Sequence, residues 1–280
     1  MPTVLVHGLL VVLLFACSAA LTKVMIRVGI ADVPNDRSSH ARPVPTSGGL
    51  AVAATFTAGI VALYLVSDIA AFAGARFMPF LLLAGVVAAF ALYDDVKHLP
   101  VKGKLSVQLV CALAFSIFVA NVDIVTLPGA GAVALGPWGH VVTVLWIVAF
   151  MNAFNFMDGI NGIAGGSALI ASVFLGAIAY VSGAGFIYLS SLCLAGATLG
   201  FLVFNFPRGR IFLGDTGSQF IAFVLAGLAV MGSASETDKI SIFVVPMIFF
   251  PFLYDVFVTL VYRLYNGRNV FSAHREHHYQ

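Results

Sequence analysis

Residues 77–100 read FMPFLLLAGVVAAFALYDDVKHLP, an apolar run without any charged side chain before the adjacent carboxylates of Asp94 and Asp95. A helix that crosses a hydrocarbon core of roughly 30 Å needs about 20 apolar residues, and the run from Phe77 is nearly that long. The carboxylates follow at its end, where nearby water lowers the cost of placing a charge in a membrane. The stretch therefore predicts a membrane-spanning helix with a polar site at one end.

The rest of the chain has the composition of an integral membrane protein. Of its 280 residues 61% are hydrophobic and 9% are charged, and the mean hydropathy is +1.03, far from the values of soluble domains. About nine apolar runs are long enough to span a membrane, namely 4–22, 48–67, 77–93, 104–120, 139–154, 162–181, 185–205, 217–233 and 240–262. The polar stretches between them are short. We therefore expect an all-α, polytopic transmembrane helix bundle that forms a single domain over residues 1–280.

The basic residues predict the orientation of this bundle. If the N-terminus lies outside, all lysines and arginines except Arg76 and Lys239 fall on one side of the membrane. Basic residues are enriched in cytoplasmic loops, so we expect a periplasmic N-terminus. The cytoplasmic face then receives every motif that could carry chemistry, in the segments 28–47, 94–104, 155–161, 206–216 and 263–280.

The carboxylate pair is the first of these motifs. Adjacent helix positions point about 100° apart, so Asp94 and Asp95 can face one metal or substrate only if the helix ends there, which Pro100 and Gly103 favour. Lys104 follows within a few residues, just after Pro100 and Gly103. Carboxylates beside ammonium groups suit a magnesium-bound polyphosphate, although a salt-bridged helix end is the simpler alternative.

Two further motifs place polar groups at the ends of apolar spans. Asn152, Asn155 and Asp158 recur every third residue and share one side of a helix end, where their polar groups need partners. Arg210 and Asp215 lead into the span that follows. Asp215 could cap that helix, or it could bind a metal carried by a substrate phosphate while Arg210 holds the anion.

The remaining candidates are basic side chains. Arg37 and His40 offer hydrogen-bond donors suited to phosphate, although a solvated positive loop would look the same. The tail groups His274, Arg275 and His277. Metal ligation by these histidines is conceivable, but a phosphate clamp fits an otherwise acidic, oxygen-rich site better.

The ninth run has an unusual pattern of its own. Pro246 and Pro251 must interrupt the helical hydrogen-bond ladder, so we expect a bent helix that opens a cleft toward lipid. Asp255 follows one turn later and would be costly facing hydrocarbon. It should therefore face the bundle, either for structural pairing or in the active site.

Five segments together resemble the polyprenyl-phosphate N-acetylaminosugar-1-phosphate transferases, in the order in which that family carries them: DVPNDRSSHARPVPTSGGLAV, YDDVKHLPVKGKLSVQL, NAFNFMDGINGIAGG, RIFLGDTGSQF and HREHHYQ. The resemblance implies transfer of an aminosugar-1-phosphate from a UDP-N-acetylaminosugar to undecaprenyl phosphate, with Mg²⁺ or Mn²⁺ and release of UMP. It implies a place in the bacterial inner membrane, contact with membrane lipids and no nucleic-acid partner, and it leaves a homodimer open. The tail is most similar to the branch that begins O-antigen with GlcNAc or a 6-deoxy-aminosugar.

The resemblance also assigns roles. It makes Asp215 the metal-binding aspartate, Asp94 and Asp95 a catalytic pair, and Asn155 and Asp158 part of a nucleotide-side motif. His274 and His277 match the last catalytic motif, while Arg37, His40, Lys104, Asn152, Arg210 and Arg275 are expected to bind substrate. A phosphate monoester is largely dianionic at neutral pH, so a role for Asp94 as base and a role as positioner both stay open.

Rival classes fit the sequence less well. Another membrane phosphotransferase or a prenyltransferase would need its own aspartate signature, and neither signature occurs with its proper spacing. A secondary transporter more often carries its key polar groups near the bilayer midplane, at breaks in helices.

Overall fold

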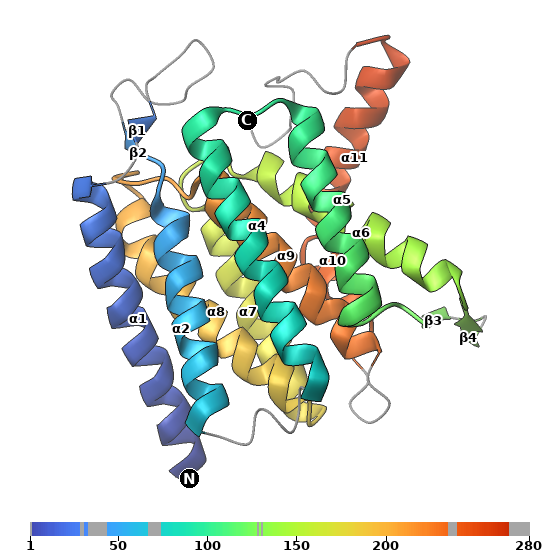
Figure 1. Cartoon of the computed structure of the whole chain (residues 1–280), viewed down its shortest axis with the longest axis horizontal. Coiled ribbons are helices and arrows are strands. Elements are labelled where there is room, and N and C mark those ends of the chain that lie inside the picture. The colour runs from blue at the N-terminus through green and yellow to red at the C-terminus, as the bar shows by residue number, and fades with distance from the viewer. Residues whose placement is uncertain are drawn as a thin grey trace.

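The computed structural model describes residues 2–28, 31–32, 44–66, 74–127, 129, 131–234 and 240–268, and helices dominate it (Figure 1). The long helices are α1 (Pro2–Val28), α2 (Gly48–Val66), α4 (Phe77–Lys97), α5 (Val101–Phe118), α6 (Trp138–Met157), α7 (Ile163–Val181), α8 (Gly185–Asn205) and α9 (Gly214–Ser233). Among the described residues these eight are long and apolar enough to cross a membrane, α4 together with the short helix η1 (Gly74–Arg76) that precedes it. The predicted all-α, polytopic bundle is confirmed.

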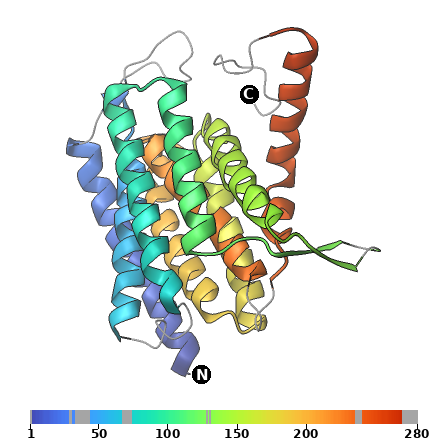
Figure 2. The ribbon, with the colours of Figure 1, turned by 45° about the vertical axis from the view of Figure 1, so that its right-hand side comes forward.

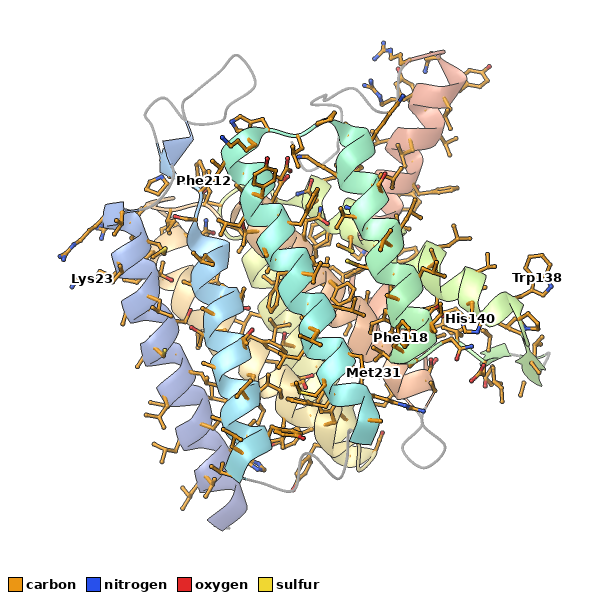
Figure 3. The ribbon with its side chains drawn as sticks, in the orientation of Figure 1. Lys23, Phe118, Trp138, His140, Phe212 and Met231 are labelled. Carbon is orange, nitrogen blue, oxygen red and sulfur yellow. The ribbon has the colours of Figure 1, made fainter. Side chains whose placement is uncertain are left out.

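Helix α9 forms the centre of the bundle. Every residue from Thr216 to Gly232 is buried, and α2, α4 and α6 pack directly against this helix. Phe212, just before α9, and Met231, near its end, mark its two ends in Figure 3. On the other side, α1 and α7 both pack against α8.

Three phenylalanines fix α4, α5 and α9 relative to one another. The ring centroids of Phe80 and Phe115 lie 6.4 Å apart, those of Phe115 and Phe223 5.8 Å, and those of Phe80 and Phe223 6.5 Å. Aromatic pairs at such separations add to the energy of burial. The helices that carry Asp94, Lys104 and Asp215 therefore share one rigid core.

The start of α9 is held against the start of α2. The Gly48 N–H donates to the Phe212 carbonyl at 3.0 Å, and the Gly49 N–H donates to the Leu213 carbonyl at 2.8 Å. A Cβ on Gly49 would lie 2.1 Å from the nitrogen of Gly217, so only glycine allows this approach. The backbone around Asp215 is thereby fixed from two directions.

Short strands close two of the connections. Strands β1 (Ala31–Asp32) and β2 (Val44–Pro45) pair antiparallel, as do β3 (Ile124–Leu127) and β4 (Gly131–Ala134). The second pair is a hairpin that extends away from the helices (Figure 2). This hairpin lies between two apolar runs, and the hydropathy pattern does not predict it.

The ninth apolar run is broken into two helices, in agreement with the interruption predicted from Pro246 and Pro251. Residues 240–262 form a short helix α10 (Val244–Ile248) and, after a break at Phe249, a 16-residue helix α11 (Phe250–Tyr265). Pro251 occupies the first turn of α11 and has no N–H to continue the ladder from α10, which accounts for the break. Helix α11 stands apart from the other helices in Figure 2. Asp255 is buried on α11, as its charge requires.

Helix ends from distant parts of the chain meet at one end of the bundle, the upper end in Figure 1. The end of α4, the start of α5 and the start of α9 lie there, with β1 and β2 beside them, and the N-terminus lies at the opposite end. A single layer of side chains at this end can therefore combine residues that are more than a hundred positions apart. The cytoplasmic orientation of this end stays a prediction from the basic residues.

Candidate active site

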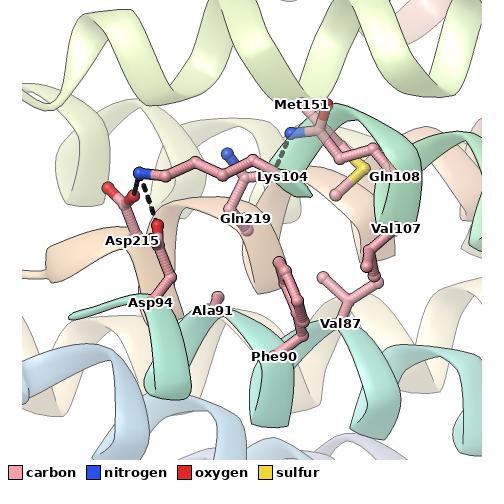
Figure 4. A pocket seen from close by; sticks show the side chains of 10 residues that line it. All are labelled: Val87, Phe90, Ala91, Asp94, Lys104, Val107, Gln108, Met151, Asp215 and Gln219. Atoms are coloured by element: carbon pink, nitrogen blue, oxygen red, sulfur yellow. Dashed lines mark hydrogen bonds and ion pairs between the residues drawn. The ribbon is translucent and has the colours of Figure 1, made fainter. Parts of the chain in front are cut away.

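Lys104 bridges two carboxylates at this end of the bundle. Its Nζ donates to Asp215 Oδ2 at 2.9 Å and forms an ion pair with Asp94 Oδ2 (Figure 4). The Asp94 side chain is 3% exposed, whereas those of Lys104 and Asp215 are 35% and 30% exposed. One ammonium group thus holds two carboxylates at a site that solvent reaches only in part.

The turn between α4 and α5 brings Asp94 and Lys104 together. Helix α4 ends at Lys97, and His98 adopts a left-handed conformation with φ of 52°. The Leu99 N–H then donates to Asp94 Oδ1 at 2.8 Å, and α5 begins after the extended Pro100. Asp94 therefore stabilises the turn that places Lys104 opposite the Asp94 carboxylate.

Asp95 points in another direction and caps α9. Its Oδ1 accepts the Asp215 N–H at 2.9 Å, and its Oδ2 accepts the Thr216 N–H at 3.0 Å and the Thr216 hydroxyl at 2.6 Å. No side chain at the start of α9 caps that helix itself. Because α4 continues past both aspartates, they diverge as adjacent helix positions must. The sequence left open whether Asp215 caps α9, and in the structure Asp95 is the residue that caps this helix.

We expect Asp95→Asn to destabilise the protein by roughly 1–3 kcal/mol, the cost of leaving a buried donor without an acceptor. The amide can accept from Asp215, but its NH₂ group then faces the Thr216 N–H. Thr216→Val is the matched control, because it removes only the hydroxyl donor and should cost less. The measurement is the thermal unfolding midpoint of the purified protein in detergent, and an unchanged midpoint for Asp95→Asn would contradict this role.

Helix α6 supplies the remaining contact to Asp215. Asn155 Nδ2 donates to Asp215 Oδ1 at 2.9 Å and to Ser218 Oγ at 2.8 Å. Both oxygens of Asp215 are therefore held, one by an ammonium group and one by an amide. An acidic side chain held by fixed donors keeps one orientation, which suits a group that must meet a cation.

Asp158 ends α6 close to this cluster. Burial, together with the charges of Asp215 and Asp95, raises the pKa of the Asp158 carboxyl well above its usual value. Its carboxyl therefore keeps a proton more readily than an exposed aspartate does. The sequence predicted Asp158 on the same side of the helix end as Asn155, and in the structure Asp158 ends α6 three residues after Asn155.

A row of buried amides lies one turn deeper. Asn152 Nδ2 donates to Gln108 Oε1 at 2.7 Å, and Gln108 Nε2 donates to Gln219 Oε1 at 2.9 Å. Asn152 was a predicted site residue, and the structure places its amide against Gln108, which lines the pocket. Gln219 was not predicted, although an amide within an otherwise apolar span was a signal that could have identified it.

A small pocket, partly open to solvent, joins the carboxylate cluster to the amide row (Figure 4). Asp94, Lys104 and Asp215 line one part of it, and Gln108 and Gln219 another. The rest of the lining is apolar: Val87, Phe90, Ala91, Val107 and Met151. The lining thus combines charged and amide groups with apolar walls, which suits a ligand that carries both a charged head and a hydrocarbon part.

Other predicted residues are not part of the cluster. Arg210 is exposed on the segment that leads into α9. Arg37, His40, His274, Arg275 and His277 lie outside the described residues. Their predicted roles stay predictions.

Asn205 is a second residue that the sequence did not single out. Its Oδ1 accepts the Gly162 N–H at 2.7 Å, and its Nδ2 donates to the Ile211 carbonyl at 2.9 Å. The buried amide thus ties the turn between α6 and α7 to the segment before α9. Asn205 is not among the residues that line the pocket.

Comparison with known proteins identifies the family of this chain. The sequence model of glycosyl transferase family 4 matches residues 77–233, which include the helices of the site. The Mycobacterium tuberculosis decaprenyl-phosphate N-acetylglucosaminephosphotransferase is 30% identical over 90% of this chain and 68% of its own length. The Escherichia coli O157:H7 undecaprenyl-phosphate alpha-N-acetylglucosaminyl 1-phosphate transferase is 29% identical over 91% of this chain and 69% of its own length.

The Bacillus subtilis "Probable undecaprenyl-phosphate N-acetylglucosaminyl 1-phosphate transferase" is also 29% identical, over 91% of this chain and 70% of its own length. The family model covers more than half of this chain, and the relatives match most of it. The chain therefore belongs to glycosyl transferase family 4, the polyprenyl-phosphate N-acetylaminosugar-1-phosphate transferases.

Proposed function

We propose that this protein transfers an N-acetylaminosugar-1-phosphate from a UDP-sugar to undecaprenyl phosphate and thereby initiates a cell-envelope polysaccharide such as O-antigen. The observation that carries the proposal is the pair of carboxylates, Asp94 and Asp215, held by Lys104 at the mouth of a largely apolar pocket. A charged head and a hydrocarbon tail are the two parts of the proposed acceptor. The O-antigen branch rests on the tail sequence from His274 to Gln280.

The proposed reaction exchanges one phosphoanhydride bond for another. An oxygen of the lipid phosphate attacks the sugar-bearing phosphorus of the UDP-sugar, and the bond from that phosphorus to the UMP oxygen breaks. UMP leaves with the electron pair of that bond. Phosphoryl transfer of this kind depends mostly on positioning and on neutralising charge, and a cluster of fixed charges suits both tasks.

The residues also fit a divalent cation. Asp94 and Asp215 already surround a single positive group, and Asn155 holds the second oxygen of Asp215. Carboxylate oxygens suit Mg²⁺ or Mn²⁺ when substrate phosphates complete the coordination. Within the described ranges, no three histidine, cysteine or acidic side chains form a ready-made metal site, which agrees with a cation that arrives with a phosphate. Asp215 would hold Mg²⁺, whose charge would offset that of the diphosphate and of the departing UMP.

Positioning is the better supported role for Asp94. One of its oxygens accepts the Leu99 N–H, and the other is ion-paired with Lys104. With both oxygens engaged, the Asp94 carboxylate is held in one orientation, as a positioning group requires. The lipid phosphate needs little help, because with a second pKa of roughly 6 it is mostly dianionic at neutral pH.

The setting follows from the helices. Eight membrane-length helices make this a multi-pass membrane protein. The bacterial inner membrane, the cytoplasmic position of the site and a homodimer are parts of the proposal. Undecaprenyl phosphate would reach the pocket from the membrane, and the UDP-sugar from water.

The test is transfer by the purified protein in detergent or liposomes with undecaprenyl phosphate and Mg²⁺. UDP-GlcNAc, UDP-GalNAc, UDP-FucNAc and UDP-QuiNAc are supplied one at a time. We expect UMP and a polyprenyl-diphosphate aminosugar in equal amounts with at least one donor, read by mass spectrometry and UMP release. Absence of lipid product with every donor, from protein that unfolds cooperatively, would overturn the proposed function.

A further inference from the structure

The buried amides form a chain with a fixed direction. Asn152 Nδ2 donates to the Val148 carbonyl at 2.8 Å, and a backbone carbonyl can only accept. The same NH₂ group donates to Gln108 Oε1, so the oxygen of Gln108 must face Asn152. The nitrogen of Gln108 must then face Gln219, and Gln219 must turn its oxygen toward it. The Val148 carbonyl thus sets the orientation of all three side chains.

The far end of this chain is a donor directed into the pocket. Because Gln219 uses its oxygen for Gln108, its Nε2 lies on the opposite side of the carboxamide (Figure 4). Gln219 is only 8% exposed and lines the pocket. No group among the described residues accepts a hydrogen bond from this nitrogen. Because this nitrogen faces the pocket, a ligand oxygen there can accept its hydrogen bond in place of water.

We propose that Gln219 Nε2 binds a phosphate oxygen of the polyprenyl phosphate and so selects the acceptor. The inference rests on the proposed function and assigns one substrate to one side chain. Gln219 lies four residues after Asp215, one turn or about 6 Å further along α9 and on the same face. A phosphate near Asp215 and Lys104 could therefore also reach this nitrogen.

A phosphate oxygen could come from the lipid or from the UDP-sugar, and the surroundings of Gln219 favour the lipid. Val87, Val107 and Met151 form apolar walls in the same pocket. Gln219 also lies deeper in the bundle than Asp215, away from the end at which a water-soluble donor would enter. A hydrocarbon chain suits these walls, and a nucleotide does not.

Two substitutions at one position separate binding from structure. Gln219→Met keeps the volume and removes the donor. Gln219→Glu keeps an oxygen for Gln108 but directs a carboxylate oxygen at the ligand. If Gln219 only supported Gln108, Gln219→Glu would be the milder change. If it donates to a phosphate, Gln219→Glu must be the more harmful one, because two anions then meet.

We expect the KM for undecaprenyl phosphate to rise about 10-fold in Gln219→Met and on the order of 100-fold in Gln219→Glu, at pH 8.5, as for a lost hydrogen bond to a charged group. The KM for the UDP-sugar should change by less than about 2-fold, because the UDP-sugar accepts no hydrogen bond from Gln219 in this proposal. Inhibition constants give a second measurement. Farnesyl phosphate is the probe of the acceptor side, and its inhibition constant should rise in parallel with the KM for the lipid. The inhibition constant of UMP should be the same in all variants.

Gln108→Met gives an independent variant, because it releases the oxygen of Gln219 and lets the amide turn. It should raise the KM for the lipid by less than Gln219→Met does. An acceptor KM that stays at the wild-type value in Gln219→Glu, or one lower than in Gln219→Met, would overturn the inference. A rise in the KM for the UDP-sugar and in the inhibition constant of UMP would overturn it in favour of the donor diphosphate. Failure of the wild type to form lipid product would instead overturn the proposed function.

Discussion

Asp215→Asn should lower kcat/KM about a thousandfold, while the protein still folds. Removing one fixed group that stabilises developing charge costs about 10²- to 10³-fold, and Asp215 would also lose its hold on Mg²⁺. The asparagine has a single acceptor oxygen for two donors, Lys104 Nζ and Asn155 Nδ2. Its NH₂ group must therefore face one of them. The start of α9 survives, because Asp95 caps it.

Asn155→Ala is the matched control for this substitution. It removes one hydrogen bond to Asp215 and keeps the carboxylate and its ion pair, so kcat/KM should fall only about 10-fold, as for one hydrogen bond. Both variants should be compared with wild type over a wide range of Mg²⁺ concentrations, with the thermal midpoint as a check on folding. Near-normal activity of Asp215→Asn at ordinary Mg²⁺ would rule out the charge of Asp215 as the essential feature.

The membrane-spanning helices were predictable because hydrocarbon imposes a length on them. Eight of the apolar runs became helices of about the expected extent, since a helix satisfies its own backbone hydrogen bonds within a bilayer. Residues 240–262 met the same criterion and still divided into α10 and α11. The prolines predicted a bend. The position of the second helix relative to the bundle depends on side-chain packing, which a hydropathy pattern does not describe.

Contacts of the site between residues close in the sequence were predictable, and contacts between residues far apart in the sequence were not. Asp94 and Lys104 meet across a short turn, which the spacing of Pro100 and Gly103 favoured. Asp95 bonds to residues 120 and 121 positions away, and nothing near Asp95 in the sequence marks it as the cap of α9. A pair of adjacent aspartates therefore looked like one catalytic unit although the helix turns the two side chains apart.

Gln108 and Gln219 show the same limit. Each is an amide in an apolar span. A buried amide needs a hydrogen-bond partner, but the sequence does not show which residue that partner is. The direction of the chain follows only from the contact between Asn152 and the Val148 carbonyl, which lies one helical turn from Asn152. Sequence can thus indicate which polar groups need partners, while the bundle decides which partners they obtain.

Asp94→Asn should lower kcat by about 10²- to 10³-fold, as for other groups that fix charge in a reaction. The loss should be the same at every pH. Asp94 holds Lys104 and the α4–α5 turn, and neither contact depends on the protonation of the lipid phosphate. A base would behave differently. It would matter most below pH of about 6, where the lipid phosphate keeps its second proton, and less at higher pH, where the substrate ionises by itself.

The measurement is kcat for Asp94→Asn and wild type from a pH of about 5.5 to about 9, a range that brackets the second phosphate pKa, at saturating substrates and Mg²⁺. Asp123→Asn is the control, because Asp123 is exposed at the other end of α5, bonded to Asn121, and its loss should leave the profile unchanged. A mutant-to-wild-type ratio that stays flat supports positioning by Asp94, since a fixed charge acts alike on every ionic form of the substrate. A ratio that climbs toward one as the pH rises would show that Asp94 accepts the proton of the lipid phosphate, and that the ion pair with Lys104 opens before the reaction.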